Sequence, residues 1–140
     1  MRTPRLRLLS ALLSVAMLFT FLPTAAFAAS ATFTVDEIQY TVTDEDAKTV
    51  SVTKYTGTDP NVVIPDKIQG YTVTAIGENA FKSSSLTNIA IPNGVTSIGN
   101  RAFHSSSLKS IDISESVTSI GEYAFAYCKS LTSITIPSSI

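Results

Sequence analysis

The side chains that most often carry catalysis are scarce in this 140-residue chain, which has one histidine, His104, and one cysteine, Cys128. A serine or cysteine nucleophile needs an oriented base, so a Ser-His-Asp or Cys-His arrangement would have to use His104. His104 stands in a slot that Lys82 and Ala126 fill at equivalent points of the chain. A slot that accepts lysine, histidine and alanine is typical of an exposed position, and we predict no catalytic residue.

Cys128 has two interpretations. As a functional group it would be a reactive thiol or half of an intermolecular bridge, since the chain has no second cysteine for an intrachain disulfide. As a structural group it is a small residue beneath a turn, because Ser84 and Ser106 hold the equivalent position three residues after a repeated phenylalanine. Free cysteine is among the most buried residue types, which favours the structural interpretation.

Metal and phosphate chemistry find little support. Asp44-Glu45-Asp46 is an acidic trio, but Ca²⁺ takes about six to eight oxygens and no second acidic cluster lies near it, so a solvated hairpin turn is favoured. One histidine and one cysteine at unrelated spacing do not indicate zinc, and the six glycines are isolated at corners. The composition does not exclude a catalytic pair of carboxylates of the kind that glycosidases use, although the acidic residues lie at positions that vary between the copies. We predict no cofactor, no metal and no enzyme activity.

The histidine and the cysteine both belong to an internal sequence repeat. Its three copies are VTAIGENAFKSSSLTNIAIPNG from Val73, VTSIGNRAFHSSSLKSIDISES from Val95 and VTSIGEYAFAYCKSLTSITIPSS from Val117, and Ile140 begins a fourth. The starts are 22, 22 and 23 residues apart. Such a period is typical of solenoids, in which each coil buries its apolar side chains against its neighbours.

Each copy predicts two short strands and a turn. Ile89-Ala90-Ile91 alternates as a strand does, and Val73-Thr74-Ala75-Ile76 is a second β-branched stretch. Gly77 follows at a corner that implies positive φ or a close backbone approach. Glu78-Asn79-Ala80-Phe81 then predicts a single helical or 3-10 turn. The phenylalanines of this turn should stack in a column within the core: Phe81, Phe103 and Phe125.

The chain divides into three parts. Residues 1–28 resemble a secretory signal peptide: arginines precede the apolar run from Leu8 to Leu22, and Ala26-Phe27-Ala28 offers a small-x-small cleavage site. A run of 15 residues is short for a membrane span, which needs about 20, so cleavage is favoured over an uncleaved anchor. Residues 29–72 alternate polar and apolar residues like a hairpin or small meander, suited to capping a solenoid. Residues 73–140 hold three repeats and the start of a fourth.

Cleavage would remove 28 of the 140 residues and leave 112, with 11 acidic and 7 basic side chains. This mildly acidic chain has no basic stripe, which argues against nucleic acid and anionic membrane surfaces as partners. No membrane insertion is expected after cleavage, and the protein is predicted to be secreted or held at the cell surface.

The pattern V-T-x-I-G-x-x-A-F-x-x-C/S followed by L-x-x-I-x-I-P resembles the BspA-type leucine-rich repeat of bacterial secreted and cell-surface proteins. The resemblance covers residues 73–140, and Val62-Val63-Ile64-Pro65 resembles a preceding half-unit. It implies a β-rich solenoid of the α/β type, a right-handed coil with short strands and short helical or 3-10 turns. To this we add an N-terminal β cap and no C-terminal cap. The resemblance also implies an extracellular scaffold associated with adhesion.

The expected ligand face is the outward side of the L-x-x-I-x-I strands, where parallel rungs roughly 4.8 Å apart would present a mostly neutral array. Its candidate residues are Thr87, Asn88, Ala90, Lys109, Ser110, Asp112, Thr132, Ser133 and Thr135. The partner would be a protein or carbohydrate at the cell surface. The same side chains could equally be soluble filler on a scaffold.

The last coil leaves further alternatives open. It would expose inward-type residues such as Ile134 and Ile136, so self-association through an uncapped C-terminal coil is expected. The chain could be a fragment of a longer protein, a truncated product, or a chain completed by a partner. Two functional alternatives to the binding scaffold follow: a repeat module of a larger secreted enzyme, or a purely structural spacer.

Overall fold

A computed structural model describes residues 30–140 of the chain. The predicted leader, residues 1–28, lies outside the described residues. Eleven strands follow one another along this part of the chain: β1 (Thr32–Val35), β2 (Ile38–Asp44), β3 (Thr49–Tyr55), β4 (Asn61–Val63), β5 (Lys67–Ile68), β6 (Tyr71–Ile76), β7 (Asn88–Ala90), β8 (Ser97–Ile98), β9 (Ser110–Asp112), β10 (Ser119–Ile120) and β11 (Ser133–Thr135).

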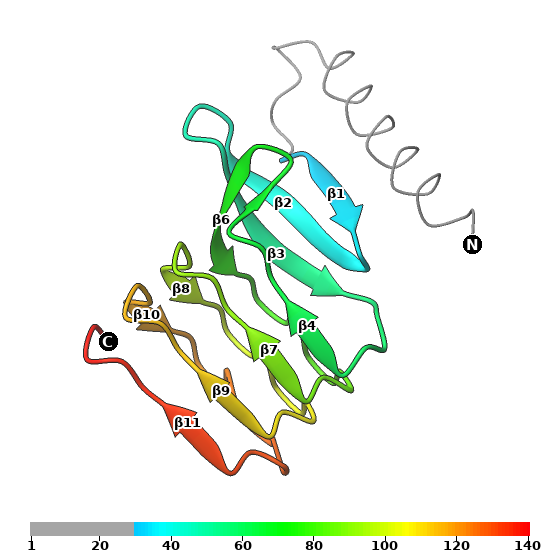
Figure 1. Cartoon of the computed structure of the whole chain (residues 1–140), viewed down its shortest axis with the longest axis vertical. Helices are drawn as coiled ribbons and strands as arrows, with labels where there is room; N and C mark the ends of the chain where they lie inside the picture. The colour runs from blue at the N-terminus through cyan, green and yellow to red at the C-terminus, as the bar shows by residue number, and fades with distance from the viewer. Residues whose placement is uncertain (1–29) are drawn as a thin grey trace.

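The repeats form a β-solenoid of about four coils with parallel strands (Figure 1). On one side β6, β8 and β10 pair in parallel, with Ile76 beside Ile98 and Ile98 beside Ile120. On the other side β4 pairs with β7 and β9 pairs with β11, again in parallel. Both strand types predicted for each repeat are therefore confirmed. Their aliphatic side chains point between the two sides and make one continuous core.

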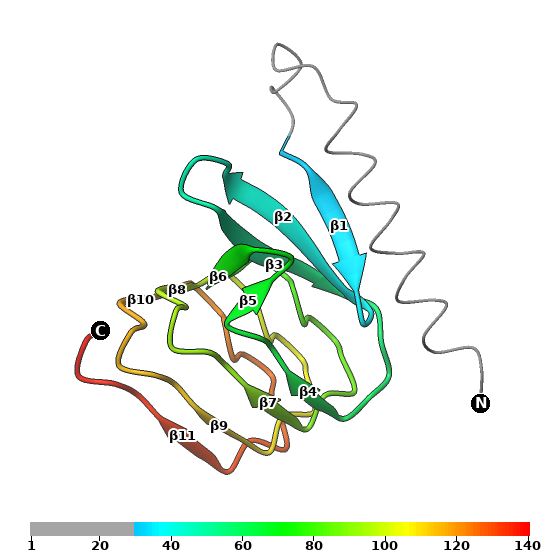
Figure 2. The ribbon, with the colours of Figure 1, turned by 45° about the horizontal axis from the view of Figure 1, so that its top comes forward.

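The N-terminal strands extend this solenoid. Within residues 29–72, where a hairpin or small meander was expected, β1, β2 and β3 form an antiparallel meander. Strand β3 then runs parallel to β6, so the meander continues the sheet that β6, β8 and β10 form (Figure 2). Aromatic rings fill the space beneath it, with Phe33 stacked on Tyr40 at 5.5 Å and tilted against Tyr71 at 6.1 Å.

The phenylalanine column is confirmed. Phe81 and Phe103 stack with ring centroids 5.3 Å apart and planes 7° from parallel, and Phe103 and Phe125 repeat the arrangement at 5.3 Å and 4°. Tyr55 adds a fourth ring, 5.5 Å from Phe81. The column thus continues from the repeats into the meander, and the two parts of the chain share one core.

The predicted helical or 3-10 turns are wrong, because residues 30–140 contain no helix. In the first copy Asn79 and Ser83 take left-handed φ values of 58° and 57°, which interrupt a right-handed helix. Alternate backbone N–H groups of the turn donate to the following coil and not within the turn, as the N–H of Phe81 does to the Ala102 carbonyl at 2.7 Å. No helix of the described residues has the length and apolarity that a membrane crossing demands.

The repeated corner glycines are explained by close approach and not by positive φ. An added Cβ on Gly99 would lie 2.7 Å from the Glu78 nitrogen, and one on Gly121 would lie 2.5 Å from the Asn100 nitrogen. Since these contacts are with the backbone of the preceding coil, no side-chain movement relieves them. Glycine therefore sets how closely successive coils stack at this corner.

At the C-terminal end, β11 has a paired strand on one side only within the described chain. Ile136 and Ile140 expose 53% and 51% of their surface, and Ile134 exposes 37%. The equivalents of Ile134 and Ile136 in the second copy, Ile111 and Ile113, are buried. This coil therefore presents inward-type side chains to solvent, as the sequence predicted.

Candidate binding face

The strand face, defined as the outward side chains of β4, β7, β9 and β11 with the residues just before each strand, runs along all four rungs (Figure 1). Its geometry follows from the alternation of each strand. In β7 the side chain of Ile89 is buried while Asn88 and Ala90 on either side of it are exposed. In β9, Ile111 is likewise buried between two exposed neighbours.

The structure brings the nine predicted residues together on this face. Eight of them are exposed and Thr87 is half-buried. The parallel register places Ser133 beside Ser110 and Thr135 beside Asp112. Whether these residues bind a ligand stays a prediction.

Part of the face is engaged in holding the coils together. The Thr87 hydroxyl donates to the Pro60 carbonyl at 3.0 Å, and the Thr132 hydroxyl donates to the Lys109 carbonyl at 3.2 Å. The Asn88 amide donates to the Asn61 side-chain oxygen at 2.8 Å. The outward groups of Ser110, Asp112, Ser133 and Thr135 make no such hydrogen bond within residues 30–140, which leaves their polar atoms for an external partner.

A hollow interrupts the ladder between β7 and β9. These strands are neighbours, joined by the bond from the Lys109 nitrogen to the Thr87 carbonyl at 3.0 Å, but they do not pair as β4 does with β7. The opening has a volume of about 290 Å³. Its lining comes from both strands: Asn88, Ile89, Ala90, Ile91, Ser110, Ile111 and Asp112.

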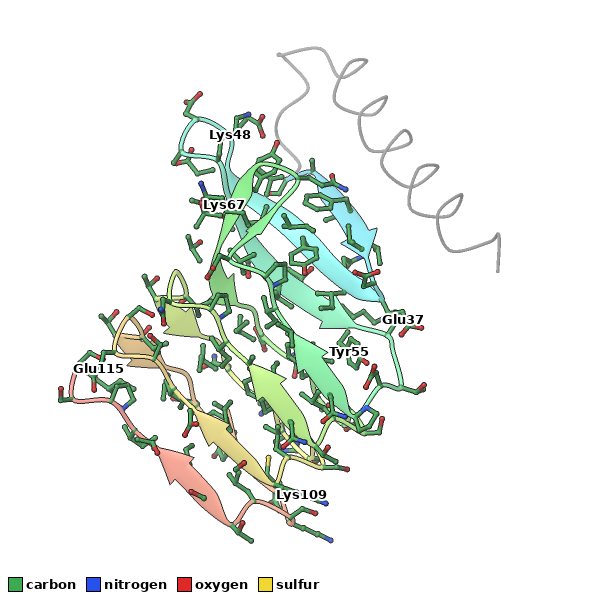
Figure 3. The ribbon with its side chains drawn as sticks, in the orientation of Figure 1. Glu37, Lys48, Tyr55, Lys67, Lys109 and Glu115 are labelled. Carbon is green, nitrogen blue, oxygen red and sulfur yellow. The ribbon has the colours of Figure 1, made fainter. Side chains whose placement is uncertain are left out.

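The electrostatic character of the face changes along its length. Lys109 and Asp112 are the charged members of the predicted set. Lys109, labelled in Figure 3, directly precedes β9, and Asp112 is the last residue of that strand, so opposite charges lie near its two ends. At the β4 end, a second hollow of about 340 Å³ is acidic, with Glu37, Asp36 and Asp59 in its lining beside Tyr55. Burial is the main cause that raises the pKa of Tyr55. The hydrogen bond from its hydroxyl to the Asp59 backbone carbonyl lowers this pKa in part, and the negative charges of Glu37 and Asp59 raise it.

Sequence reasoning left two parts of the surface out. Asn61 and Val63 of β4 extend the strand face by one rung, and Val63 exposes 75% of its surface. The half-unit resemblance of residues 62–65 was the available signal. The second part is the turn edge, residues 78–85, 100–107 and 122–130, where Tyr123 and Tyr127 expose 61% and 71% of their surface. The sequence offered one indication of this edge: the third copy has tyrosine at two positions where the other copies have asparagine, arginine or serine.

The two residues singled out for chemistry lie on the turn edge. His104 is half-buried, with its Nδ1 2.9 Å from the Ser105 hydroxyl. Cys128 is also half-buried, and its thiol donates to the Phe103 carbonyl at 3.0 Å, in the structural position beneath the turn. In the described part of the chain no group of three or more His, Cys, Asp or Glu side chains is placed to hold a metal ion.

Parallel rungs on two sides, a shared aromatic column and a close glycine corner in every coil define a leucine-rich-repeat solenoid. The chain belongs to the BspA type leucine-rich repeat region family, whose model matches residues 60–140 in six copies. The match begins before the first full repeat and includes β4, in agreement with the pairing of β4 and β7.

Solved structures of three bacterial proteins are similar to this chain. The pneumococcal vaccine antigen PcpA matches with 22% identity and a TM-score of 0.53, over 79% of this chain and 39% of that one. A leucine rich cell surface protein from Faecalibacterium prausnitzii A2-165 matches with 19% identity and a TM-score of 0.36, over 76% and 55%.

A leucine-rich repeat protein from Bacteroides ovatus matches with 29% identity and a TM-score of 0.39, over 76% and 42%. The chain thus spans about half or less of the length of these three structures. The likeness to PcpA supports the solenoid fold. No curated protein matches the chain.

Proposed function

We propose that the protein is a non-catalytic extracellular scaffold that binds a protein or carbohydrate ligand at the bacterial cell surface through the strand face. The observation that carries this proposal is the exposure of polar side chains across four neighbouring rungs, several of which make no hydrogen bond to another coil within residues 30–140. Repeat solenoids use such extended surfaces for recognition.

The contrast between inward and outward positions supports a role for the face. Inward positions hold the same aliphatic type in each copy, as Ile89 and Ile111 do, because the core leaves no freedom. Outward positions differ: Asn88 corresponds to Ser110, and Ala90 to Asp112. The hollow between β7 and β9 breaks an otherwise flat surface and gives a ligand a place to insert a side chain or sugar ring.

The location is supported by the residue order of the leader and by a structural neighbour described as a cell surface protein. The leader proposal is tested by mass spectrometry of the protein secreted from its host or from a heterologous bacterium. We expect a mature chain that begins at Ala29. A product that retains residues 1–28 in the membrane fraction would contradict secretion.

The binding proposal is tested by screening the purified protein against arrays of extracellular-matrix proteins and bacterial or host glycans. Each protein or neutral glycan that binds is then measured with a double variant, Asn88→Arg with Ser110→Arg, which fills the hollow between β7 and β9. We expect this variant to weaken binding by about tenfold or more, because contacts near the centre of an interface contribute most of the binding energy.

The matched control is Thr96→Arg with Thr118→Arg, which adds the same charge at exposed positions next to β8 and β10. This control should bind as the unmodified protein does. Equal loss in both double variants would contradict a site on the strand face. Failure of every protein and glycan probe would favour a structural spacer, and an in-frame catalytic domain in the gene would favour a module of a secreted enzyme.

A further inference from the structure

The turn edge contains a hollow that shares no residue with the strand face. Its volume is about 430 Å³. Ser105, Ser106 and Ser107 of the second coil form one wall, and Tyr127, Lys129 and Ser130 of the third coil form the other. Among the described residues that line it, Lys129 is the charged one and none is acidic.

Tyr127 is a residue that the fold does not require. Ser83 and Ser105 occupy its slot in the other copies, and all three residues have φ values of 57° to 58°. A bulky side chain in this left-handed region is unfavourable compared with a small polar one. Burial does not offset that cost, since 71% of Tyr127 is exposed. A strained and exposed aromatic residue is a reason to look for a ligand.

The ring of Tyr127 is nevertheless held in place. His104 contacts it edge-on, with ring centroids 5.1 Å apart and planes at 62°. His104 is itself fixed by the Ser105 hydroxyl, which lies 2.9 Å from Nδ1 and belongs to the lining of the hollow. With 71% of the residue exposed, Tyr127 remains accessible from solvent despite this contact.

The third coil also differs in length at this point. Seven residues run from Phe125 to Leu131 inclusive, whereas six run from Phe103 to Leu108 in the second coil, so the third coil has one extra residue here. The longer segment includes Lys129 and Ser130, and both line the hollow. Lys129, whose side chain is exposed, therefore lines the same hollow as Tyr127 and the serines.

We propose that this hollow binds an acidic saccharide. The combination of groups fits that chemistry. An aromatic ring offers a flat apolar surface to the C–H face of a sugar. The exposed Ser105 and Ser130 can hydrogen-bond to its hydroxyls, and Lys129 can pair with its carboxylate. The absence of acids from the described lining removes the repulsion that a carboxylated sugar would meet at the acidic hollow beside Tyr55.

The test measures binding of tetragalacturonate and of sialyllactose by isothermal titration calorimetry, with galactotetraose and lactose as the neutral counterparts. These two acidic probes distinguish a uronic acid polymer from a sialylated glycan. We expect binding of one acidic probe and about tenfold weaker binding of its neutral counterpart. Tyr127→Ser, which installs the residue of the other copies, should weaken binding of the acidic probe about tenfold.

The matched control is Tyr123→Asn. Tyr123 is also exposed and left-handed, at φ 57°, and Asn79 fills its slot in the first copy, but it does not line the hollow. This variant should bind as the unmodified protein does. Lys129→Gln should remove the preference for the acidic probe, and both tyrosine variants should melt at or above the temperature of the unmodified protein.

Three outcomes would overturn the proposal: no binding of either acidic probe, equal affinity for acidic and neutral sugars, or equal loss in the two tyrosine variants. The result is independent of the strand face, because Asn88→Arg with Ser110→Arg should leave saccharide binding at the turn edge unchanged.

Discussion

Phe103 is the side chain on which the stacking of coils depends most directly. It is fully buried and lies between Phe81 and Phe125, with both ring distances at 5.3 Å. Phe103→Ala should lower the free energy of unfolding by about 3 to 5 kcal/mol, because it leaves a cavity that the neighbouring coils cannot close. Chemical denaturation measures this loss. Phe125→Ala, at a half-buried position, should cost less, and equal losses would contradict the cavity argument.

Gly99 makes a second prediction at the residue scale. A methyl group there would press on the Gly77 carbonyl carbon and the Glu78 nitrogen of the preceding coil. Gly99→Ala should therefore destabilise the protein by about 1 to 3 kcal/mol, the usual cost of overpacking. A thermal melt reports the change, with Ser97→Ala at a nearby half-buried position as the control. An unchanged melting temperature for Gly99→Ala would show that the coils separate at little cost.

At the scale of elements, the tip of the β2–β3 hairpin is tied to β6. The Tyr71 hydroxyl donates to the Glu45 carboxylate at 2.9 Å, and Lys48 forms an ion pair with the same carboxylate. Burial raises the pKa of Tyr71 to about 12, and the hydrogen bond and charge of Glu45 add to the effect. The hydrogen bond from Lys48 is the main cause that lowers the pKa of Glu45. The acidic trio is thus part of a turn with structural contacts.

This arrangement predicts a loss of stability in alkali. A tyrosine ionises with a pKa of 10.0 when unperturbed, and both Tyr71 and Tyr40 have pKa values raised to about 12 in the folded chain. Their contribution is complete below pH 10 and is lost as the pH rises toward 12, because the unfolded state ionises first. Denaturation at about pH 8 and about pH 11 measures the loss. Tyr71→Phe should reduce it, and an equal loss in this variant would exclude Tyr71 as a source.

The repeat sequence specifies some elements better than others. The strands and the phenylalanine column could be predicted because their apolar residues recur in register and have only one way to be buried together, as Ile89, Ile111 and Phe103 show. The turn could not, since the left-handed φ of Arg101 and its bond to the following coil depend on a neighbour that local propensity does not include. The hollow at Tyr127 was missed for the same reason, as its walls come from two coils.

At the scale of the whole molecule, we expect a protein that consists of residues 30–140 to self-associate through the aliphatic residues exposed on its last coil. Ile136 exposes 53% of its surface next to the edge of β11. Sedimentation velocity should show mass above the monomer that increases with concentration, and Ile136→Lys should reduce it because a charge on an edge opposes pairing. Val63→Lys is the control, since Val63 is exposed at the opposite end of the strand face. A monodisperse monomer would contradict this prediction.

The hydrogen bonds between turns give the solenoid a direction. The N–H groups of Phe81 and Phe103 both donate forward, to carbonyls of the coil that follows. Along the described coils the turn edge is therefore polar, because each coil accepts hydrogen bonds from the coil before it. To join such a stack, a coil has to present its carbonyls to the N–H groups of the coil before it.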